Sequence, residues 1–229
     1  MTKPPAMLLL GSAAALALGL WIDVRVDLAG QTAVGAAWWA LLLWWLAPLP
    51  RAERRPYIAC IALATAGELF LSQVWGLYSY RLGNVPLFVP AGHGLLLLLA
   101  LSLARRTSGA AARAVFWGAA AYAVAAGLAG LDEMAAPMFL LMAIAWLALP
   151  TQRRLFAATF VLALALEIYG TRSGNWAWAR SVPWTGVATT NPPLCSGGVY
   201  CALDALVVAA CAALARGPYQ PLNLKEETR

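Results

Sequence analysis

Three carboxylates lie inside strongly apolar stretches of this sequence: Glu68, Glu167 and Asp204. A carboxylate at the depth of a membrane-spanning helix is costly to insert, so it normally faces a cavity or a partner and marks a functional site. The alternative is that each carboxylate only hydrogen-bonds to neighbouring helices and holds them together. Because Glu68 and Glu167 occupy matching places in the sequence, we favour a functional role.

A pair of aromatic residues, separated by one position, follows each glutamate: Tyr78 and Tyr80 in the first case, Trp176 and Trp178 in the second. Tyr and Trp commonly form belts at membrane–water interfaces, which is the alternative explanation. Their fixed place behind each glutamate favours side chains that line the same cavity.

The single histidine, His93, lies between two glycines at the start of an apolar segment. In the second half of the chain, Ser196 occupies the corresponding place. Ser196, Tyr200 and Asp204 are spaced four residues apart and therefore share one face of a helix. We expect residues from both halves to converge on one cavity. The predicted catalytic residues are Glu68, His93, Glu167 and Asp204, and the predicted substrate-binding residues are Tyr78, Tyr80, Trp176, Trp178, Asn191 and Tyr200.

Two kinds of chemistry suit this set of residues. A carboxyl group that stays protonated in an apolar pocket can act as a general acid, as alkene or epoxide chemistry requires. One histidine with three carboxylates could instead hold a divalent metal. The sequence has no HxxxH or HExxH motif, no phosphate-binding glycine loop and no dinucleotide fingerprint. We therefore predict neither a bound metal nor a cofactor.

The composition indicates the class of protein in which these residues lie. Of 229 residues, 62% are hydrophobic and only 11% are charged, and the mean hydropathy is +0.71. Soluble domains carry about 25% charged residues, so an ordinary soluble domain is excluded. The apolar blocks are continuous rather than alternating, which excludes an outer-membrane barrel. The sequence predicts an all-α, polytopic membrane protein.

Eight apolar segments predict transmembrane helices, at about 6–23, 34–49, 57–74, 87–104, 112–130, 135–149, 155–171 and 197–215. Most have the 17 to 25 residues or so that a membrane span requires, and the second and sixth are short.

Basic residues predict the orientation, because cytoplasmic loops carry an excess of Lys and Arg. Twelve lie at the N-terminus, the even-numbered connections and the tail: Lys3, Arg51, Arg54, Arg55, Arg105, Arg106, Arg113, Arg153, Arg154, Arg216, Lys225 and Arg229. Four lie on the other side: Arg25, Arg81, Arg172 and Arg180. We expect both termini in the cytoplasm and a location in the bacterial inner (plasma) membrane. The net charge of +6 then reflects topology, and no nucleic-acid partner is expected.

The two halves of the chain resemble each other. A Trp-Leu-Ala motif, a proline and an arginine pair occur in the same order in both, and each glutamate follows the second arginine by thirteen residues. Apolar helices resemble one another in sequence simply because of their composition. The matched glutamate, glycine, aromatic and proline positions are not explained in this way. We predict two parallel four-helix repeats, 1–108 and 109–216, followed by a cytoplasmic tail at 217–229.

One stretch also resembles a known family: Gly76-Leu77-Tyr78-Ser79-Tyr80, then Gly83, then Val85-Pro86-Leu87-Phe88-Val89-Pro90. These residues resemble the carotenoid biosynthesis protein family, multi-spanning membrane enzymes that include hydratases of acyclic carotenoids. The resemblance covers about 25 of 229 residues and implies Glu68, Tyr78 and Tyr80 as site residues. It departs at His93, where the family pattern has a tryptophan.

The leading hypothesis is a cofactor-independent membrane enzyme, of hydratase or lyase type. It would perform acid–base hydration or isomerisation on an isoprenoid or another lipid-soluble substrate, in a cavity facing outward. Two alternatives stay open: a proton-coupled transporter of a small solute, or an assembly subunit of a larger membrane complex. In every case the lipid bilayer is the expected partner.

Overall fold

The computed structural model describes residues 2–215. Within this range the chain forms eight α-helices: α1 (Ala6–Asp23), α2 (Leu28–Leu46), α3 (Arg51–Glu68), α4 (Phe88–Ala104), α5 (Gly109–Leu128), α6 (Ala135–Ala148), α7 (Arg153–Ser173) and α8 (Gly197–Ala215). A π-helix (Leu69–Val74) continues α3, a 3₁₀ turn (Pro150–Gln152) precedes α7, and there are two short strands, β1 (Tyr78–Tyr80) and β2 (Trp176–Trp178). The predicted tail at 217–229 lies outside the described residues, together with Arg216, Lys225 and Arg229.

The prediction of an all-α chain is confirmed. Among the described helices, five are long and apolar enough to cross a membrane: Ala6–Asp23, Arg51–Val74, Gly109–Leu128, Pro150–Ser173 and Gly197–Leu214. Helices α4 and α6 are apolar but shorter, with 17 and 14 residues. Helix α2 has 19 residues and is also largely apolar, but it is not among these five. The fold is therefore that of a membrane-type protein.

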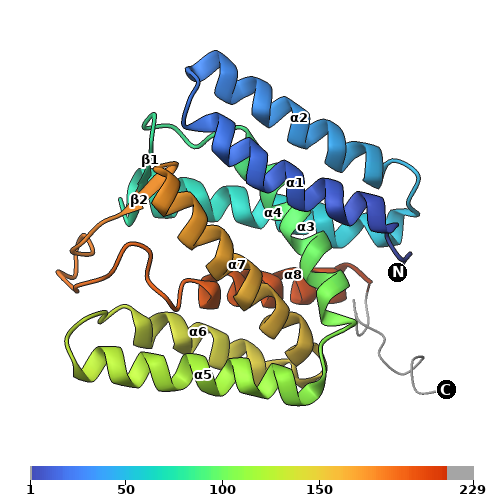
Figure 1. Ribbon diagram of the computed structural model, residues 1–229. Helices are drawn as coiled ribbons and strands as arrows, with labels where there is room; N and C mark the ends of the chain where they lie inside the picture. The colour runs from blue at the N-terminus through green and yellow to red at the C-terminus, as the bar shows by residue number, and fades with distance from the viewer. Residues whose placement is uncertain (1, 216–229) are drawn as a thin grey trace.

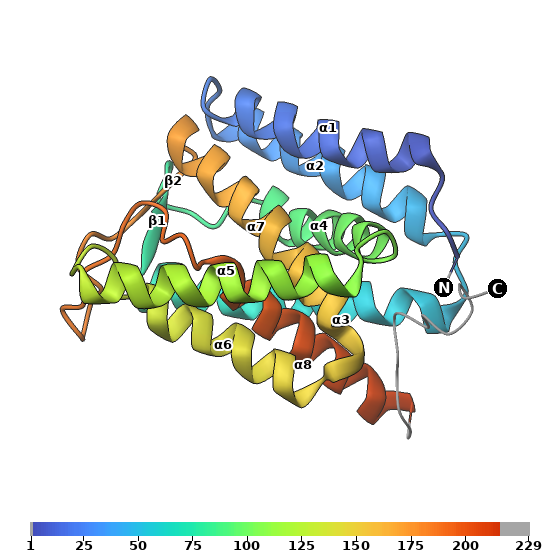
Figure 2. The same cartoon turned by 60° about the horizontal axis from the view of Figure 1, so that its bottom comes forward.

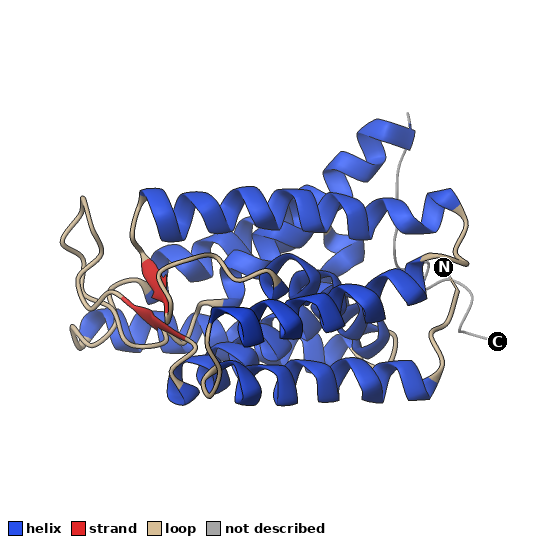
Figure 3. Cartoon of the chain, turned by 90° about the horizontal axis from the view of Figure 1, so that it is seen from above, coloured by secondary structure: helices blue, strands red, loops and turns tan. Residues whose placement is uncertain are grey.

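The helices form three layers, which Figure 1 and Figure 2 show from two sides. The central layer contains α3, α4, α7 and α8, in which α4 packs on both α3 and α7 and α8 packs on the same two helices. Helices α1 and α2 cover α4, while α5 and α6 cover α7 and α8. The strands and long connections lie together at one end of the molecule, and α1 begins at the opposite end (Figure 3). The centre of the bundle near the strands is therefore enclosed by helices from both halves of the chain.

Side-chain caps determine where two of the helices begin. Asp27 accepts a hydrogen bond from the Gly30 backbone N–H at 3.0 Å, and Ser108 accepts one from the Ala111 N–H at 3.1 Å. Such caps satisfy N–H groups that have no partner within the helix. The Asp27 cap starts α2 at Leu28, so the prediction of this helix at 34–49 was wrong by several residues at its start. Hydropathy alone did not identify this polar first turn.

The two strands join the halves of the chain at one end. They pair antiparallel, with Tyr78 opposite Trp178 and Tyr80 opposite Trp176. In each strand the two aromatic side chains are buried and the middle residue is exposed. This pattern arises because side chains alternate along a strand. All four aromatic rings therefore face the interior of the bundle.

A buried network around Asp23 holds the strand end of the first half. Its carboxylate accepts hydrogen bonds from Gln31 Nε2 at 2.8 Å and from Asn175 Nδ2 at 2.7 Å, and it pairs with Arg81 at 3.6 Å. Arg81 Nη2 also donates to the backbone carbonyl of Asp23. Because buried polar groups require partners, this network fixes the connection after β1 to the end of α1.

Asp132 plays the same part in the second half. Its carboxylate accepts from the hydroxyls of Tyr122, Thr189 and Thr190 at 3.2, 3.3 and 3.1 Å, and from the Leu194 backbone N–H at 3.3 Å. These bonds fix the connection between β2 and α8 to the end of α5.

All four cysteines of the described chain are buried free thiols: Cys60, Cys195, Cys201 and Cys211. Burial raises the pKa of the Cys195 thiol to about 12, and the nearby Asp132 carboxylate adds to this effect.

Candidate functional site

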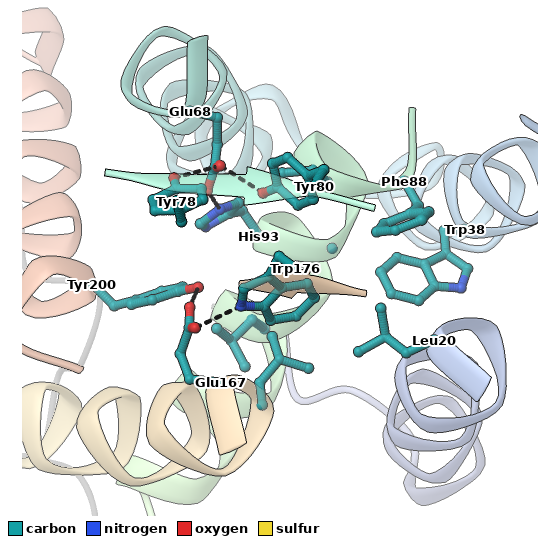
Figure 4. Close-up of a pocket in the computed structure, with 14 residues that line it drawn as sticks. Leu20, Trp38, Glu68, Tyr78, Tyr80, Phe88, His93, Glu167, Trp176 and Tyr200 are labelled. Carbon is teal, nitrogen blue, oxygen red and sulfur yellow. Dashed lines mark hydrogen bonds and ion pairs between the residues drawn. The ribbon is translucent and has the colours of Figure 1, made fainter. Parts of the chain in front are cut away.

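Glu68 is the centre of a first group of hydrogen bonds (Figure 4). The hydroxyls of Tyr78 and Tyr80 both donate to Glu68 Oε2 at 2.6 Å, and His93 Nε2 lies 3.0 Å from Oε1. The Glu68 residue is only 8% exposed. We call Glu68, Tyr78, Tyr80 and His93 the Glu68 half-site.

Glu167 is the centre of a second group. The indole N–H groups of Trp176 and Trp178 donate to Glu167 Oε2 at 2.8 and 2.9 Å, and the Tyr200 hydroxyl donates to Oε1 at 2.8 Å. Glu167 is 4% exposed. We call these four residues the Glu167 half-site, and the two half-sites together the acid cluster.

Ring contacts join the two half-sites. His93 and Tyr200 stack with their centroids 5.3 Å apart and an interplanar angle of 22°. Tyr78 also packs on Trp178, with centroids 4.9 Å apart. Figure 4 shows Glu68 and Glu167 on opposite sides of this stack, each directed toward it. The prediction that Glu68, His93 and Glu167 converge therefore agrees with the geometry.

The backbone explains why each strand reaches its glutamate. Positive φ angles at Gly76 (72°) and Gly174 (87°) turn the chain out of the helix and into the strand, a conformation that glycine adopts readily. From Glu68 to Tyr78 is one residue more than from Glu167 to Trp176. The π-helix Leu69–Val74 accommodates this extra residue, because its hydrogen bonds span five residues instead of four.

Two cavities meet at the acid cluster, and both are lined by Glu68, Tyr78, His93, Glu167 and Tyr200. The inner cavity has a volume of about 40 Å³ and is otherwise lined by Leu20, Trp38, Tyr80, Phe88, Val89, Gly92, Leu96, Leu166 and Trp176. The α3–α8 cavity has a volume of about 210 Å³ and is otherwise lined by Leu63, Ala64, Gly67, Leu71, Trp178, Val199, Ala202, Leu203 and Leu206. Apart from the shared residues, both walls are mainly apolar.

Donor and acceptor chemistry determines where protons can reside. Indole N–H groups only donate, so Glu167 Oε2 must accept. Burial, and then the negative charge of Glu68, raise the pKa of Tyr78 and of Tyr80 well above its usual value, so both phenols stay protonated. They too act as donors, which makes Glu68 Oε2 an acceptor. A proton taken up by either carboxyl group would therefore reside at Oε1, next to His93 or Tyr200.

Asp204 lies apart from the two glutamates. It is 4% exposed, and its carboxylate accepts from the Thr159 hydroxyl at 2.5 Å. It lines a smaller cavity of about 10 Å³ with His93 and Tyr200, and it lines neither of the two larger ones. Asp204 therefore lies close to His93 and Tyr200 but outside the two larger cavities.

Asn191 has an exposed position in the connection after β2. Its side-chain oxygen accepts a hydrogen bond from the Trp178 backbone N–H at 3.0 Å. Asn191 lines neither of the two cavities, so in this structure it holds the strand that carries Trp178.

The sequence did not reveal the far wall of the inner cavity. Trp38 and Phe88 pack there with centroids 5.1 Å apart. A Cβ atom at Gly92 would lie 2.8 Å from the Trp38 ring, so only glycine leaves room for this indole. A Cβ atom at Gly19 would lie 2.4 Å from Trp38 Nε1, so these two glycines are the signals of this wall in the sequence.

Among the described residues, no group of three or more His, Cys, Asp or Glu side chains is arranged to hold a metal ion. No protein-family model, curated protein or solved structure gives a significant match to the chain.

Proposed function

We propose that this protein is an integral membrane enzyme that performs cofactor-independent acid–base chemistry on a lipid-soluble substrate. The observation that carries the proposal is the acid cluster: two buried glutamates, each with three hydrogen-bond donors, border two apolar cavities. Buried carboxylates that line a cavity, rather than only joining helices, are typical of catalytic or transport sites.

The proposal includes eight membrane spans with the strand end outside. Five of the described helices are long and apolar enough to span, and α4 and α6 are shorter apolar helices. The connections at the end opposite the strands carry the arginine-rich sequences, including Arg54, Arg105 and Arg153. The excess of basic residues on the cytoplasmic side supports this orientation in a bacterial inner membrane.

It also includes the origin of the two halves by duplication. In the antiparallel ribbon, a two-fold rotation through the centre exchanges Tyr78 with Trp176 and Tyr80 with Trp178, the same pairs that the sequence comparison matches. The same exchange relates the partners of Glu68 to those of Glu167, since each glutamate binds two strand aromatics and one ring of the next helix. These coincidences support a parallel repeat of four helices.

In the proposed reaction, the proton shared by Glu68 Oε1 and His93 adds to one carbon of a substrate double bond. In a hydration, a water oxygen then bonds to the other carbon, and the surplus water proton goes to Glu167 Oε1. In an isomerisation, Glu167 instead removes a proton from the neighbouring carbon. Passage of a proton from Glu167 back to the Glu68–His93 pair restores the starting state in both cases.

The surroundings suit such a reaction. The cationic carbon would lie against aromatic faces, which attract positive charge. Tyr78, Trp178 and Trp176 supply such faces next to the carboxylates. The local resemblance to the carotenoid biosynthesis family makes an acyclic isoprenoid the first substrate to test.

A proton-coupled transporter would need a path from the acid cluster to both ends of the bundle. The small cavity beside Asp204 extends away from the strands, but its lining includes none of the arginines of the opposite end. This geometry favours the enzyme.

The experiment compares the purified wild type with Glu68→Gln and Glu167→Gln on an acyclic carotenoid, with products identified by mass spectrometry and NMR. Each amide keeps the shape of the side chain, so folded yield should be retained. We expect each variant to lose about 10² to 10⁴-fold in activity, the usual contribution of a positioned acid or base. The matched control is Glu133→Gln, an exposed carboxylate at the same end that lines neither cavity. Folded amide variants with full activity would contradict acid catalysis.

A further inference from the structure

The two cavities differ in how they reach the surface. Most residues that line the inner cavity are buried. The apolar residues of the α3–α8 cavity are mostly part-exposed, and Leu206 is 56% exposed. Because α3 and α8 are both long and apolar enough to span a membrane, this opening faces the hydrocarbon of the bilayer.

Gly67 occupies the floor of this opening, one residue before Glu68. A Cβ atom at Gly67 would meet nothing within 4 Å, whereas at Gly92 or Gly94 it would lie less than 3 Å from a neighbouring side chain. Helix packing therefore does not require glycine at position 67. Glycine is also unfavourable inside a helix, so its presence there needs another reason. Its missing side chain enlarges the cavity next to the catalytic carboxylate and permits close approach of a ligand.

The charge of the lining restricts what can bind. None of the described residues that line the two cavities is Lys or Arg. A phosphate, diphosphate or carboxylate would therefore lack a cationic partner there and would face Glu68 and Glu167. Uncharged apolar chains meet no such cost.

We propose that an uncharged apolar chain dissolved in the bilayer enters sideways between α3 and α8, passes over Gly67 and ends in the inner cavity at Trp38 and Phe88. Both cavities share Glu68, His93, Glu167 and Tyr200. The middle of such a chain, rather than a polar head group, therefore lies at the acid cluster. Its reactive bond then lies at a fixed distance from the buried end. The catalytic part of this inference rests on the proposed function, and the access route is tested separately.

The test uses a long-chain alcohol that carries a photoactivatable diazirine in the middle of its chain, added to the full-length protein in lipid nanodiscs. After illumination, labelled peptides are mapped by mass spectrometry. We expect labels on peptides with Glu68 and Tyr200, in addition to unspecific labels on the lipid-facing Trp117, which is 66% exposed. The phosphate ester of the same alcohol should label Trp117 but not the acid cluster.

Gly67→Phe should fill the opening and lower labelling of the acid cluster by about tenfold or more, the size of a steric misfit in an apolar pocket. Gly118→Phe is the matched control, because a Cβ atom there also meets nothing within 4 Å, on an exposed face of α5. Gly67→Ala should fold well and reduce labelling only slightly. Unlabelled acid-cluster peptides in the wild type, or equal labelling of the wild type and a folded Gly67→Phe, would overturn the proposed route.

Glu68→Gln separates the route from the reaction. We expect this variant to be labelled as the wild type is, while product formation is lost. If labelling depends on Gly67 but Glu68→Gln keeps full activity, the proposed reaction is wrong and the route stands. If Glu68→Gln is inactive but a folded Gly67→Phe is labelled normally, the route is wrong and the reaction stands.

Discussion

The two half-sites have the same arrangement of hydrogen bonds but different donor groups. Each glutamate accepts two bonds at Oε2 from the aromatic residues of a strand and one contact at Oε1 from a ring on the next helix. At Glu68 that ring is His93, whose Nε2 donates to or accepts from Oε1 according to the tautomer of the imidazole. At Glu167 two donors are indoles, which never accept a proton. In the proposed reaction, this difference makes the Glu68 half-site the proton donor, and it makes Glu167, held by three donors, the carboxylate that accepts a proton.

The largest expected effect comes from changing the spacing between each glutamate and the strand that follows it. Deletion of Gln73, an exposed residue of the π-helix, would make the first glutamate-to-strand spacing equal to the second. We expect this variant to fold, because the extra residue is absorbed within the π-helix. Deletion of Arg172, an exposed residue of the regular helix α7, would rotate the chain after the deletion by about 100° and separate Trp176 from Glu167.

The measurement is the yield of monodisperse protein after detergent extraction. We expect near wild-type yield after the first deletion and loss of folded protein after the second. Equal yields would mean that the π-helix is not the element that accommodates the difference in spacing.

A second test exchanges the rings next to Oε1. His93→Gln removes the group that shares a proton with Glu68, and we expect activity to fall by about 10² to 10⁴-fold. Tyr200→Phe removes only one donor to Glu167, so we expect a smaller loss, of about tenfold, as for one hydrogen bond of 0.5–1.5 kcal/mol. Activity is measured as for the amide variants. A larger loss from Tyr200→Phe would reverse the assigned roles.

Removal of single donors at Oε2 should affect stability more than activity. Tyr78→Phe and Trp178→Phe each leave a buried carboxylate with one partner fewer, which costs about 1–3 kcal/mol. We expect Trp178→Phe to cost more, because it also removes part of a large ring. Thermal unfolding in detergent measures both. If neither variant lowers the unfolding midpoint, the bonds at Oε2 do not stabilise the bundle.

The smallest expected effect is a pH dependence. Burial and the charge of Glu68 raise the pKa of Tyr78 and of Tyr80 in the folded protein. As the pH rises above about 10, where unfolded tyrosines ionise, the unfolded state loses protons first and the folded state loses stability. The contribution of Tyr78 and Tyr80 to the free energy of unfolding is complete below that pH and is lost at higher pH. In ultraviolet titrations, the double variant Tyr78→Phe, Tyr80→Phe should show as many tyrosines ionising near pH 10 as the wild type. A decrease by two would contradict the shift.

The sequence was informative where a single residue type carries a large energetic cost. Carboxylates in apolar segments are expensive, so Glu68 and Glu167 were recognisable as site residues, and the aromatic spacing identified their donors. The apolar blocks predicted the helices, and α2 was misplaced because Asp27 and Gln31 make its first turn polar.

Other features depend on contacts that are distant in sequence. The pairing of β1 with β2 joins residues almost one hundred positions apart, and nothing in either three-residue strand specifies its partner. Asp23 is the last residue of a predicted apolar segment, and its partners Arg81 and Asn175 come from other connections that the sequence did not link to it. Asp204 shares a helix face with Tyr200, but it points to Thr159, one cavity away from the glutamates.

The partners of each glutamate have a consequence for how the chain is made. Glu68 finds all three donors between residues 78 and 93, and Glu167 finds all three between residues 176 and 200. Chains leave the ribosome from the N-terminus, and N-terminal units generally fold first. The first glutamate can therefore be satisfied while the second half is still being synthesised. Each carboxylate therefore needs only the strand and the helix that directly follow it in the chain, and Glu68 needs no residue of the second half.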